Sequence, residues 1–362
     1  MEKRKDAFRG CLLGGAVGDA LGYTVEFLSE YTINKRYGEN GITEYDLVNG
    51  VAQISDDTQM TLFTANGLLL GETMKRVGKE GDYCDYIALC YKDWFYTQNK
   101  RFPLPLEETS SWLVNLGELF SLRAPGNTCL SALTDFCQGK RGSVLSPINN
   151  SKGCGGVMRV APIGIYFGKE NTIEEVDLLA AEASAITHGH ELGYIPSSGL
   201  AHILYRIVND GYPLLKAVEE MIEEMPRLFP YADYVDDFVS LMKKAVELSQ
   251  SHLSDIDAIH LLGEGWVAEE TLAIAIFCAL RYSKDFENVV VASVNHNGDS
   301  DSTGAVTGNI LGAYLGLSKI PEKFLENLEL KEVILTLADD LFDGYREDKD
   351  WQKKYIDKTF RP

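Results

Sequence analysis

The sequence is poor in basic residues, because 34 Lys and Arg stand against 54 Asp and Glu, which gives a net charge of -20. A nucleic-acid-binding surface needs clustered Lys and Arg, so this balance argues against such a surface. A small anionic ligand can still bind locally. No uninterrupted apolar run approaches the roughly 18 residues of a membrane-spanning helix, and we expect no membrane contact.

The seven cysteines have no C-x-x-C spacing and are odd in number. A disulfide framework or a structural zinc site normally shows paired spacings, so we expect reduced thiols and a cytoplasmic location. The start of the chain has a basic end and an apolar run, like a signal peptide. However, Asp19 interrupts the run and no small-x-small cleavage site follows. We therefore interpret this segment as a helix.

Linkers and long strand patterns are also lacking: no stretch rich in Pro, Gly or Ser divides the 362 residues. We predict one all-α domain over residues 1–362, and a monomer. Weak alternation and turn glycines over residues 39–53 indicate a short irregular hairpin. Apolar residues at helical spacing predict the helices, which we place at 7–22, 60–70, 82–98, 107–122, 127–136, 173–187, 199–208, 214–225, 234–249, 268–282, 304–316 and 331–341.

Two of these helices carry a glycine at every fourth position. The stripes are Gly10, Gly14, Gly18 and Gly22 in the first helix, and Gly304, Gly308, Gly312 and Gly316 near the end of the chain. Glycine inside a helix costs roughly 1 kcal/mol relative to alanine, so a repeated stripe indicates close packing against each other or a common partner. This packing would bring Asp19 and Glu26 towards the core. We interpret Asp19 as a buried, hydrogen-bonded carboxylate rather than a ligand.

Two short motifs combine hydroxyls with carboxylates at the start of an apolar helix. One is Ser55-Asp56-Asp57-Thr58, and the other is the run from Asp299 to Ser302. A single Asp or Ser would suffice for helix capping, whereas this composition suits a hard cation bound by oxygen atoms. Adjacent carboxylates repel each other unless a cation compensates, and the four Asp charges balance two divalent ions.

Several loops contain more polar chemistry than a connection needs. Gly153, Gly155 and Gly156 can present backbone N–H groups to a phosphate, although for this segment taken alone we favour simple turn formation. His188 and His190 do not share a helical face, so they predict capping or ligand contact rather than a zinc pair. Trp266, in Leu262 to Trp266, can stack on a base or fill the core. Asn127 is interpreted as a helix cap and a substrate-binding candidate.

Taken in order, the GDALG start, SDDT, SKGCGGVMRVAPIG, THGH and GDSDS resemble the ADP-ribosylglycohydrolase family, over roughly residues 8–316. The resemblance implies a single-domain orthogonal helical bundle with a dinuclear Mg²⁺ centre, or a Mn²⁺ centre, in a central cleft. It implies catalytic roles for Glu26, Asp56, Asp57 and Asp299. The metal ligands that it implies are Ser55, Asp56, Asp57, Asp299, Asp301 and Ser302.

The same resemblance implies substrate contacts from Ser151, Gly153, Cys154, Gly155, His188, Gly265 and Trp266. Two positions depart from the usual family pattern. Asn297 begins a motif that is usually Gly-Gly-Asp-Thr-Asp-Thr, and Cys154 stands where asparagine is common. Serine in place of threonine keeps the hydroxyl ligand.

The expected reaction is the hydrolytic removal of ADP-ribose from a protein side chain or a small conjugate. The GDALGYTVEF start resembles the dinitrogenase reductase-activating branch of the family, and this resemblance favours the arginine linkage, with Glu26 and Asp93 as acidic groups for the guanidinium. Two other functions stay open on the sequence. A dimetal phosphodiesterase would use the same aspartates with Lys152 and Arg159 near the phosphoryl group, and a catalytically inactive ADP-ribose-binding or structural member would keep the site without turnover.

Overall fold

The computed structural model describes residues 2–361 and is helical throughout this range, with isolated β-bridges but no extended strand. Short 3₁₀ segments and one π-helical segment (Arg206–Asp210) connect the α-helices. The α-helices are α1 (Glu2–Tyr23), α2 (Glu30–Tyr37), α3 (Asp56–Arg76), α4 (Tyr83–Asn99), α5 (Asn127–Cys137), α6 (Ala161–Tyr166), α7 (Ile173–Ala185), α8 (Glu191–Tyr205), α9 (Leu214–Leu228), α10 (Val235–Ser249), α11 (Asp255–Leu262), α12 (Ala268–Arg281), α13 (Phe286–Val294), α14 (Ser300–Leu315), α15 (Lys331–Asp343) and α16 (Lys349–Tyr355).

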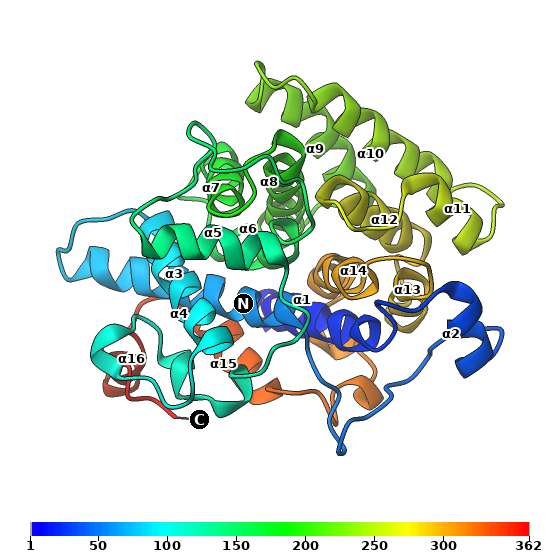
Figure 1. Cartoon of the computed structure of the whole chain (residues 1–362). Helices are drawn as coiled ribbons and strands as arrows, with labels where there is room; N and C mark the ends of the chain where they lie inside the picture. Colours follow the sequence, from blue (N-terminus) through cyan, green and yellow to red (C-terminus); the bar gives the residue numbers. More distant parts are fainter. Residues whose placement is uncertain (1, 362) are drawn as a thin grey trace.

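Helices α1 and α14 lie side by side at the centre of the molecule (Figure 1). They run antiparallel with their glycine stripes facing each other, so the predicted close packing is confirmed. A Cβ atom on Gly18 would lie 1.9 Å from the carbonyl oxygen of Gly304, which leaves room only for hydrogen. The stripes meet in three glycine pairs, Gly10 with Gly312, Gly14 with Gly308 and Gly18 with Gly304, and Gly22 meets the backbone of Ser300.

The other helices surround this central pair. Helix α3 packs on α4, α7 packs on α8, and α12 and α13 cover α14, while α9, α10 and α11 form an outer layer (Figure 1). Helix α3 is buried from Asp56 to Thr73, so nearly its whole length is enclosed by neighbours. The buried apolar side chains form one continuous cluster that includes residues from α1 to α16.

Two predicted elements differ from the structure. The helix expected over residues 107–122 is wrong, because three short 3₁₀ segments occupy this stretch: Leu106–Glu108, Trp112–Asn115 and Gly117–Leu119. The buried carboxylate of Asp93 accepts the N–H groups of Ser110 and Ser111, which removes them from a helical ladder. The hairpin over residues 39–53 is reduced to one bridge between Val48 and Val51.

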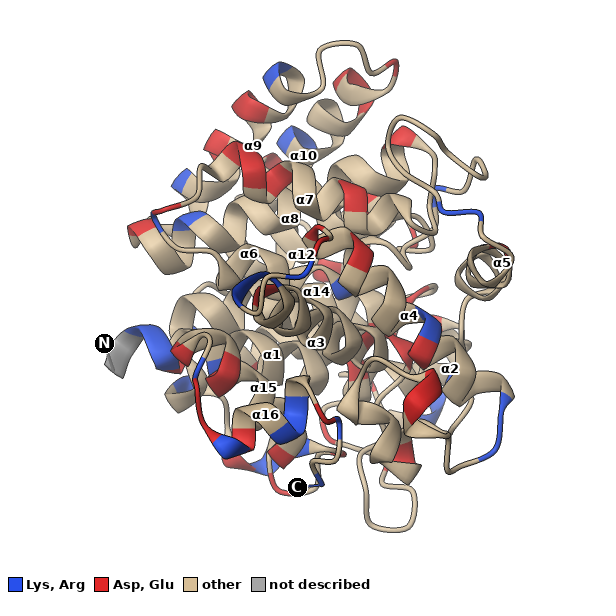
Figure 2. Cartoon of the chain, turned by 90° about the vertical axis from the view of Figure 1, so that its left-hand side faces the viewer, with Lys and Arg blue, Asp and Glu red and all other residues tan. Residues whose placement is uncertain are grey.

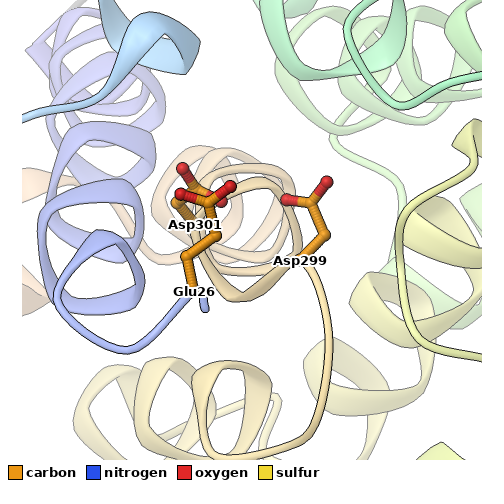
Figure 3. A group of neighbouring side chains, drawn as sticks. All are labelled: Glu26, Asp299 and Asp301. Carbon is orange, nitrogen blue, oxygen red and sulfur yellow. The ribbon is translucent and has the colours of Figure 1, made fainter. Parts of the chain in front are cut away.

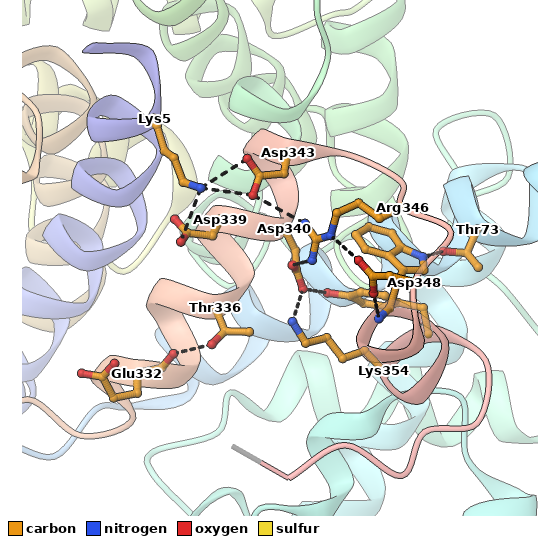
Figure 4. A network of polar contacts seen from close by, with 12 residues as sticks. Lys5, Thr73, Glu332, Thr336, Asp339, Asp340, Asp343, Arg346, Asp348 and Lys354 are labelled. Atoms are coloured by element: carbon orange, nitrogen blue, oxygen red, sulfur yellow. Dashed lines mark hydrogen bonds and ion pairs between the residues drawn. The ribbon is translucent and has the colours of Figure 1, made fainter. Parts of the chain in front are cut away.

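The C-terminal helix α16 is attached to the body by buried polar contacts (Figure 4). Asp340 in α15 accepts hydrogen bonds from Lys354 and Tyr355, both at 2.8 Å, and from Arg346 at 2.7 Å. The indole N–H of Trp351 donates to Thr73 of α3 at 3.0 Å. A single buried carboxylate therefore holds three groups from the last part of the chain.

Charged residues of both signs alternate over the side of the molecule that Figure 2 displays, where short basic segments lie between acidic ones. Among the helices of residues 2–361, none combines the length and the apolar character that crossing a bilayer demands.

Candidate metal and substrate site

The two acidic motifs start neighbouring buried helices, and the structure brings them to one place. Ser55 caps α3, because its Oγ accepts the N–H of Asp57 at 3.2 Å. Asp299 caps α14, because its Oδ1 accepts the N–H of Ser302 at 3.2 Å. Both motifs therefore combine capping with a surplus of carboxylate oxygens. The surplus oxygens face a shared cavity.

Glu26 joins this group from the turn that follows α1. Carboxylate oxygens of Glu26, Asp299 and Asp301 lie within 4.8 Å of one another, and all three side chains are buried. Figure 3 shows Glu26 and Asp301 beside each other, with Asp299 across from them on the loop that enters α14. Asp56 and Asp57 line the same cavity but are not part of this tight group.

Asp19 supports the first acidic motif from behind. Its carboxylate accepts the N–H of Ser55 at 2.9 Å and the N–H of Thr58 at 3.1 Å, and it also bonds the hydroxyl of Thr58. Asp19 is fully buried. The prediction of a hydrogen-bonded structural carboxylate is confirmed, and Asp19 fixes the start of α3.

The carboxylates of the cluster raise each other's pKa values. Burial is the largest cause for each, and the negative charge of Asp301 comes next for Glu26, Asp56 and Asp57. The combined effect raises the pKa of Glu26 to about 11. Burial and repulsion by Asp301 also raise the pKa of Asp299 well above its usual range. The site thus concentrates negative charge that only protons or cations can offset.

The donor set fits a hard divalent cation. Oε2 of Glu26 and Oδ1 of Asp57 are buried and have no hydrogen-bond partner among the described residues. Carboxylate and hydroxyl oxygens are the ligands that Mg²⁺ and Mn²⁺ prefer. The cluster of Glu26, Asp299 and Asp301 can therefore hold a metal ion.

The carboxylates form the floor of a cavity of about 450 Å³, a size suited to a small molecule. Most of the residues predicted from the sequence line it together. They are Glu26, Asp56, Asp57, Asn127, Gly153, Cys154, Gly155, His188, Trp266, Asp299, Asp301 and Ser302.

Three predicted site residues lie behind this lining. Ser55 places its Oγ 3.4 Å from Oδ2 of Asp57. The Oγ of Ser151 lies 3.1 Å from that of Thr128 and accepts the N–H of Gly153 at 3.4 Å. Gly265 has φ +81°, and a Cβ atom there would lie 2.7 Å from Thr303.

Two cavity residues have environments that define their chemistry. The thiol of Cys154 donates to Oδ2 of Asp299 at 2.8 Å. Burial, followed by the positive charge of Arg159, lowers the pKa of His188 to about 3, so its ring is neutral. Nδ1 of His188 lies 2.8 Å from the hydroxyl of Thr187.

Other expectations require correction. Asp93 is buried away from the cavity against Ser110 and Ser111, so it is not an acidic rim group. Arg159 and Lys152, the candidate partners of a phosphoryl group, are not among the residues that line the cavity. Arg159 is buried and donates to Thr187 at 2.7 Å, and Lys152 pairs with Glu269. The cap of α5 is Gly126 rather than Asn127, which is the first helical residue.

Sequence reasoning missed Phe27, which pairs with the predicted Trp266 at the mouth of the cavity. Phe27 is 73% exposed and stacks on Trp266, which is 40% exposed, with ring centroids 6.1 Å apart and an interplanar angle of 23°. Phe27 directly follows Glu26, and that adjacency was the available signal. The capping expectation for the THGH motif holds at His190, whose Nδ1 accepts the N–H of Leu192 at 3.0 Å.

Comparison with known proteins gives consistent matches over nearly the whole chain. The sequence model of the family described as ADP-ribosylglycohydrolase matches residues 1–350. An uncharacterized protein of Archaeoglobus fulgidus is 30% identical over 94% of this chain and 97% of its own. The ADP-ribosyl-[dinitrogen reductase] glycohydrolase of Rhodospirillum rubrum is 25% identical, over 90% and 91%. A solved structure described as an ADP-ribosylglycohydrolase-related protein complex matches with a TM-score of 0.66 and 26% identity, over 95% of this chain and 99% of that one.

Proposed function

This chain belongs to the ADP-ribosylglycohydrolase family, and on that premise we propose that it is a metal-dependent hydrolase that releases ADP-ribose from modified protein side chains. The observation that carries the proposal is the convergence of Glu26, Asp299 and Asp301 at the floor of a ligand-sized cavity. Family membership supplies the substrate class, and the buried carboxylates supply the reason for metal dependence.

We assign the metal-binding role to the hydroxyls and carboxylates of the two helix-start motifs. The proposed ligands are Ser55, Asp56, Asp57, Asp299, Asp301 and Ser302, with Mg²⁺ as the ion and Mn²⁺ as its substitute. When bound, the two cations supply Lewis-acid polarisation at the reacting sugar. Cys154 holds the carboxylate of Asp299 through its thiol and thereby orients one ligand.

In the proposed reaction, water attacks the anomeric carbon of the ribose that is joined to the side chain. The new C–O bond forms as the bond from that carbon to the leaving nitrogen or oxygen breaks, and the sugar passes through an oxocarbenium-like state. Glu26 takes the proton from the attacking water and delivers it to the leaving nitrogen or oxygen as the glycosidic bond breaks. This role requires Glu26 to be ionised, which a neighbouring cation favours.

The remaining cavity residues are proposed to bind the ADP moiety. The N–H of Gly155 is the proposed donor to the diphosphate, because the N–H of Gly153 already donates to Ser151 and that of Cys154 to the carbonyl oxygen of Trp266. The neutral ring of His188 can accept or donate one hydrogen bond without adding charge. Trp266 offers an exposed face for stacking at the mouth. Asn127, Ser151, Cys154 and Gly265 complete the proposed binding set.

We favour arginine as the linkage that is cleaved. A guanidinium leaving group is a cation, and the mouth above Glu26 leads into a strongly acidic cavity. Phe27 adds an exposed ring on which a planar guanidinium can stack. Asp93 has no part in this recognition, because it is buried against Ser110 and Ser111 away from the cavity.

The experiment compares the release of ADP-ribose from arginine-, serine- and acetyl-linked substrates, with and without Mg²⁺, beside a generic phosphodiester. Metal-dependent release supports the hydrolase, and a preference for arginine supports the linkage. Faster release from serine or acetyl linkages contradicts the arginine assignment only. Cleavage of the phosphodiester alone, or binding of ADP-ribose without release, contradicts the proposed reaction.

A further inference from the structure

The turn that carries Glu26 leads directly into α2, and the first residue of that helix is bonded to the loop that carries Asp299. The N–H of Glu30 donates to Oδ1 of Asn297 at 2.9 Å. In return, the N–H of Asn297 donates to Oε1 of Glu30 at 3.3 Å. Two residues that lie 267 positions apart in the sequence thus exchange a reciprocal pair of hydrogen bonds.

A third element joins this pair. Nε2 of His260, in α11, lies 2.5 Å from Oε1 of Glu30. That carboxylate oxygen therefore receives contacts from α11 and from the loop before α14. The side chains of Glu30 and His260 are 23% and 47% exposed, respectively. The contact does not belong to the packed core and has no evident role in burying apolar surface.

The same three segments meet at two further points. The stack of Phe27 on Trp266 joins the Glu26 turn to the loop after α11. The N–H of Asp299 donates to the carbonyl oxygen of Glu264 at 2.9 Å, which joins that loop to the start of α14. The turn, the α11 loop and the α14 loop therefore form a closed ring of contacts around one side of the carboxylate cluster.

Local hydrogen bonds hold the turn itself but do not direct it towards α14. The N–H of Val25 donates to Gly22, and the N–H of Leu28 donates to Val25, both at 2.8 Å. Both bonds lie within residues 22–28. Gly22 packs against the backbone of Ser300 and Asp301 and so places the start of the turn, and the contacts that reach the α14 loop after Glu26 hold the other end of the turn. Glu30 makes such contacts four residues after Glu26.

We propose that Glu30, Asn297 and His260 form a positioning clasp that holds the Glu26 carboxylate beside the proposed ligands Asp299 and Asp301. The position of this negative charge then sets the cation affinity of the site. The proposal rests on the proposed function, because it assigns these residues to the same centre. The three residues touch neither substrate nor metal and act only through the placement of Glu26. Losses from removing such supporting hydrogen bonds are typically about 10-fold or more in metal affinity.

The test measures Mn²⁺ binding to the full chain by electron paramagnetic resonance, in parallel with ADP-ribose release and thermal unfolding. Glu30→Ala removes both side-chain contacts, and we expect about 10-fold weaker Mn²⁺ binding. Glu30→Gln keeps an acceptor oxygen for Asn297 and His260, and we expect near-parental affinity. His260→Ala removes one contact and should give a smaller loss.

Glu39→Ala serves as the matched control, since Glu39 is an exposed carboxylate just beyond α2 with no side-chain bond to the described residues. Glu39→Ala removes the same charge as Glu30→Ala but leaves the contacts of Glu30, Asn297 and His260 unchanged. Parental Mn²⁺ affinity in both Glu30→Ala and His260→Ala overturns the proposal. So does equal weakening in Glu30→Gln and Glu30→Ala, because that result attributes the effect to charge. If Glu30→Ala fails to fold, the clasp is judged on the Mn²⁺ affinities of His260→Ala and Glu30→Gln.

The outcome is separable from the proposed function. A parent protein that binds Mn²⁺ but releases no ADP-ribose contradicts the hydrolase, while the clasp is still judged on Mn²⁺ affinity. A parent that hydrolyses the substrate but shows no effect of the clasp variants contradicts the clasp alone.

Discussion

Replacing Gly308 with alanine tests whether the contact between α1 and α14 depends on the absence of a side chain. The new Cβ atom would lie 2.0 Å from the carbonyl oxygen of Gly14 and 2.5 Å from its carbonyl carbon. An ordinary contact begins at 3.4 Å, so the helices must separate locally by about 1.4 Å (3.4 minus 2.0). Both contacted atoms belong to the backbone of a buried helix, so no side chain can rotate away to relieve the overlap.

The expected free-energy change follows from two opposing effects. Alanine improves the intrinsic helix propensity by about 1 kcal/mol, whereas overpacking of this kind costs about 3 kcal/mol. We therefore expect net destabilisation of roughly 2 kcal/mol. With an unfolding entropy of about 2.1 cal/mol/K per residue over this chain, the midpoint of thermal unfolding falls by about 3 °C. Leucine at the same position should be worse.

The assay is urea unfolding followed by circular dichroism, together with calorimetry. Gly117→Ala is the control, because its Cβ atom would have no neighbour closer than the ring of Phe102 at 4.0 Å. The reasoning is refuted if Gly308→Ala unfolds at or above the urea concentration and temperature of the parent. In that case helix propensity alone decides, and the glycine stripe is not a close-packing surface.

Three further predictions concern charged groups. Asp57→Asn or Asp299→Asn should weaken Mn²⁺ binding by at least 10-fold while the helical content persists, because each removes a proposed ligand; unchanged binding in calorimetric titration would contradict the ligand assignment. Asp93→Asn should flatten the decline in stability with pH, because burial raises the pKa of Asp93 to about 7. In the parent, stability falls from about pH 4 to 7, where the unfolded state alone loses the proton. An equal decline in parent and variant, measured by urea unfolding at each pH, would show that the pKa of Asp93 is not raised. Asp340→Ala leaves the buried ammonium of Lys354 without its partner and should cost about 3–5 kcal/mol; a trypsin cleavage rate near the C-terminus equal to that of the parent would argue against it.

The parts of the fold that the sequence predicted are those with a strong local signal. The glycine stripes identified α1 and α14 because a glycine every fourth residue follows the helical repeat. The two acidic motifs were also visible, because their composition exceeds what a helix cap needs. The helix expected over residues 107–122 failed because Asp93, in the preceding helix α4, takes the N–H groups of Ser110 and Ser111.

The residues of the candidate site also fall into those with a local sequence signal and those without one. Asp56, Asp57, Asp299 and Asp301 were identified from their motifs, and all four line one cavity. Phe27 and His260 were not identified, because a single aromatic residue or histidine carries no pattern of its own. Their roles arise from contacts with Trp266 and Glu30 that depend on the packing of three separate segments.

The sequence alone determined that the chain is helical, that two helices carry glycine stripes, and that carboxylates cluster at helix starts, since each property is written in residues that are close together along the chain. Only the tertiary structure decided which stripe faces which, that Glu26 rather than Asp93 meets the aspartates, and how the Glu26 turn is held. These outcomes depend on atoms that come within a few ångströms of each other from positions more than 200 residues apart. Such distances are set by the packing of the whole chain.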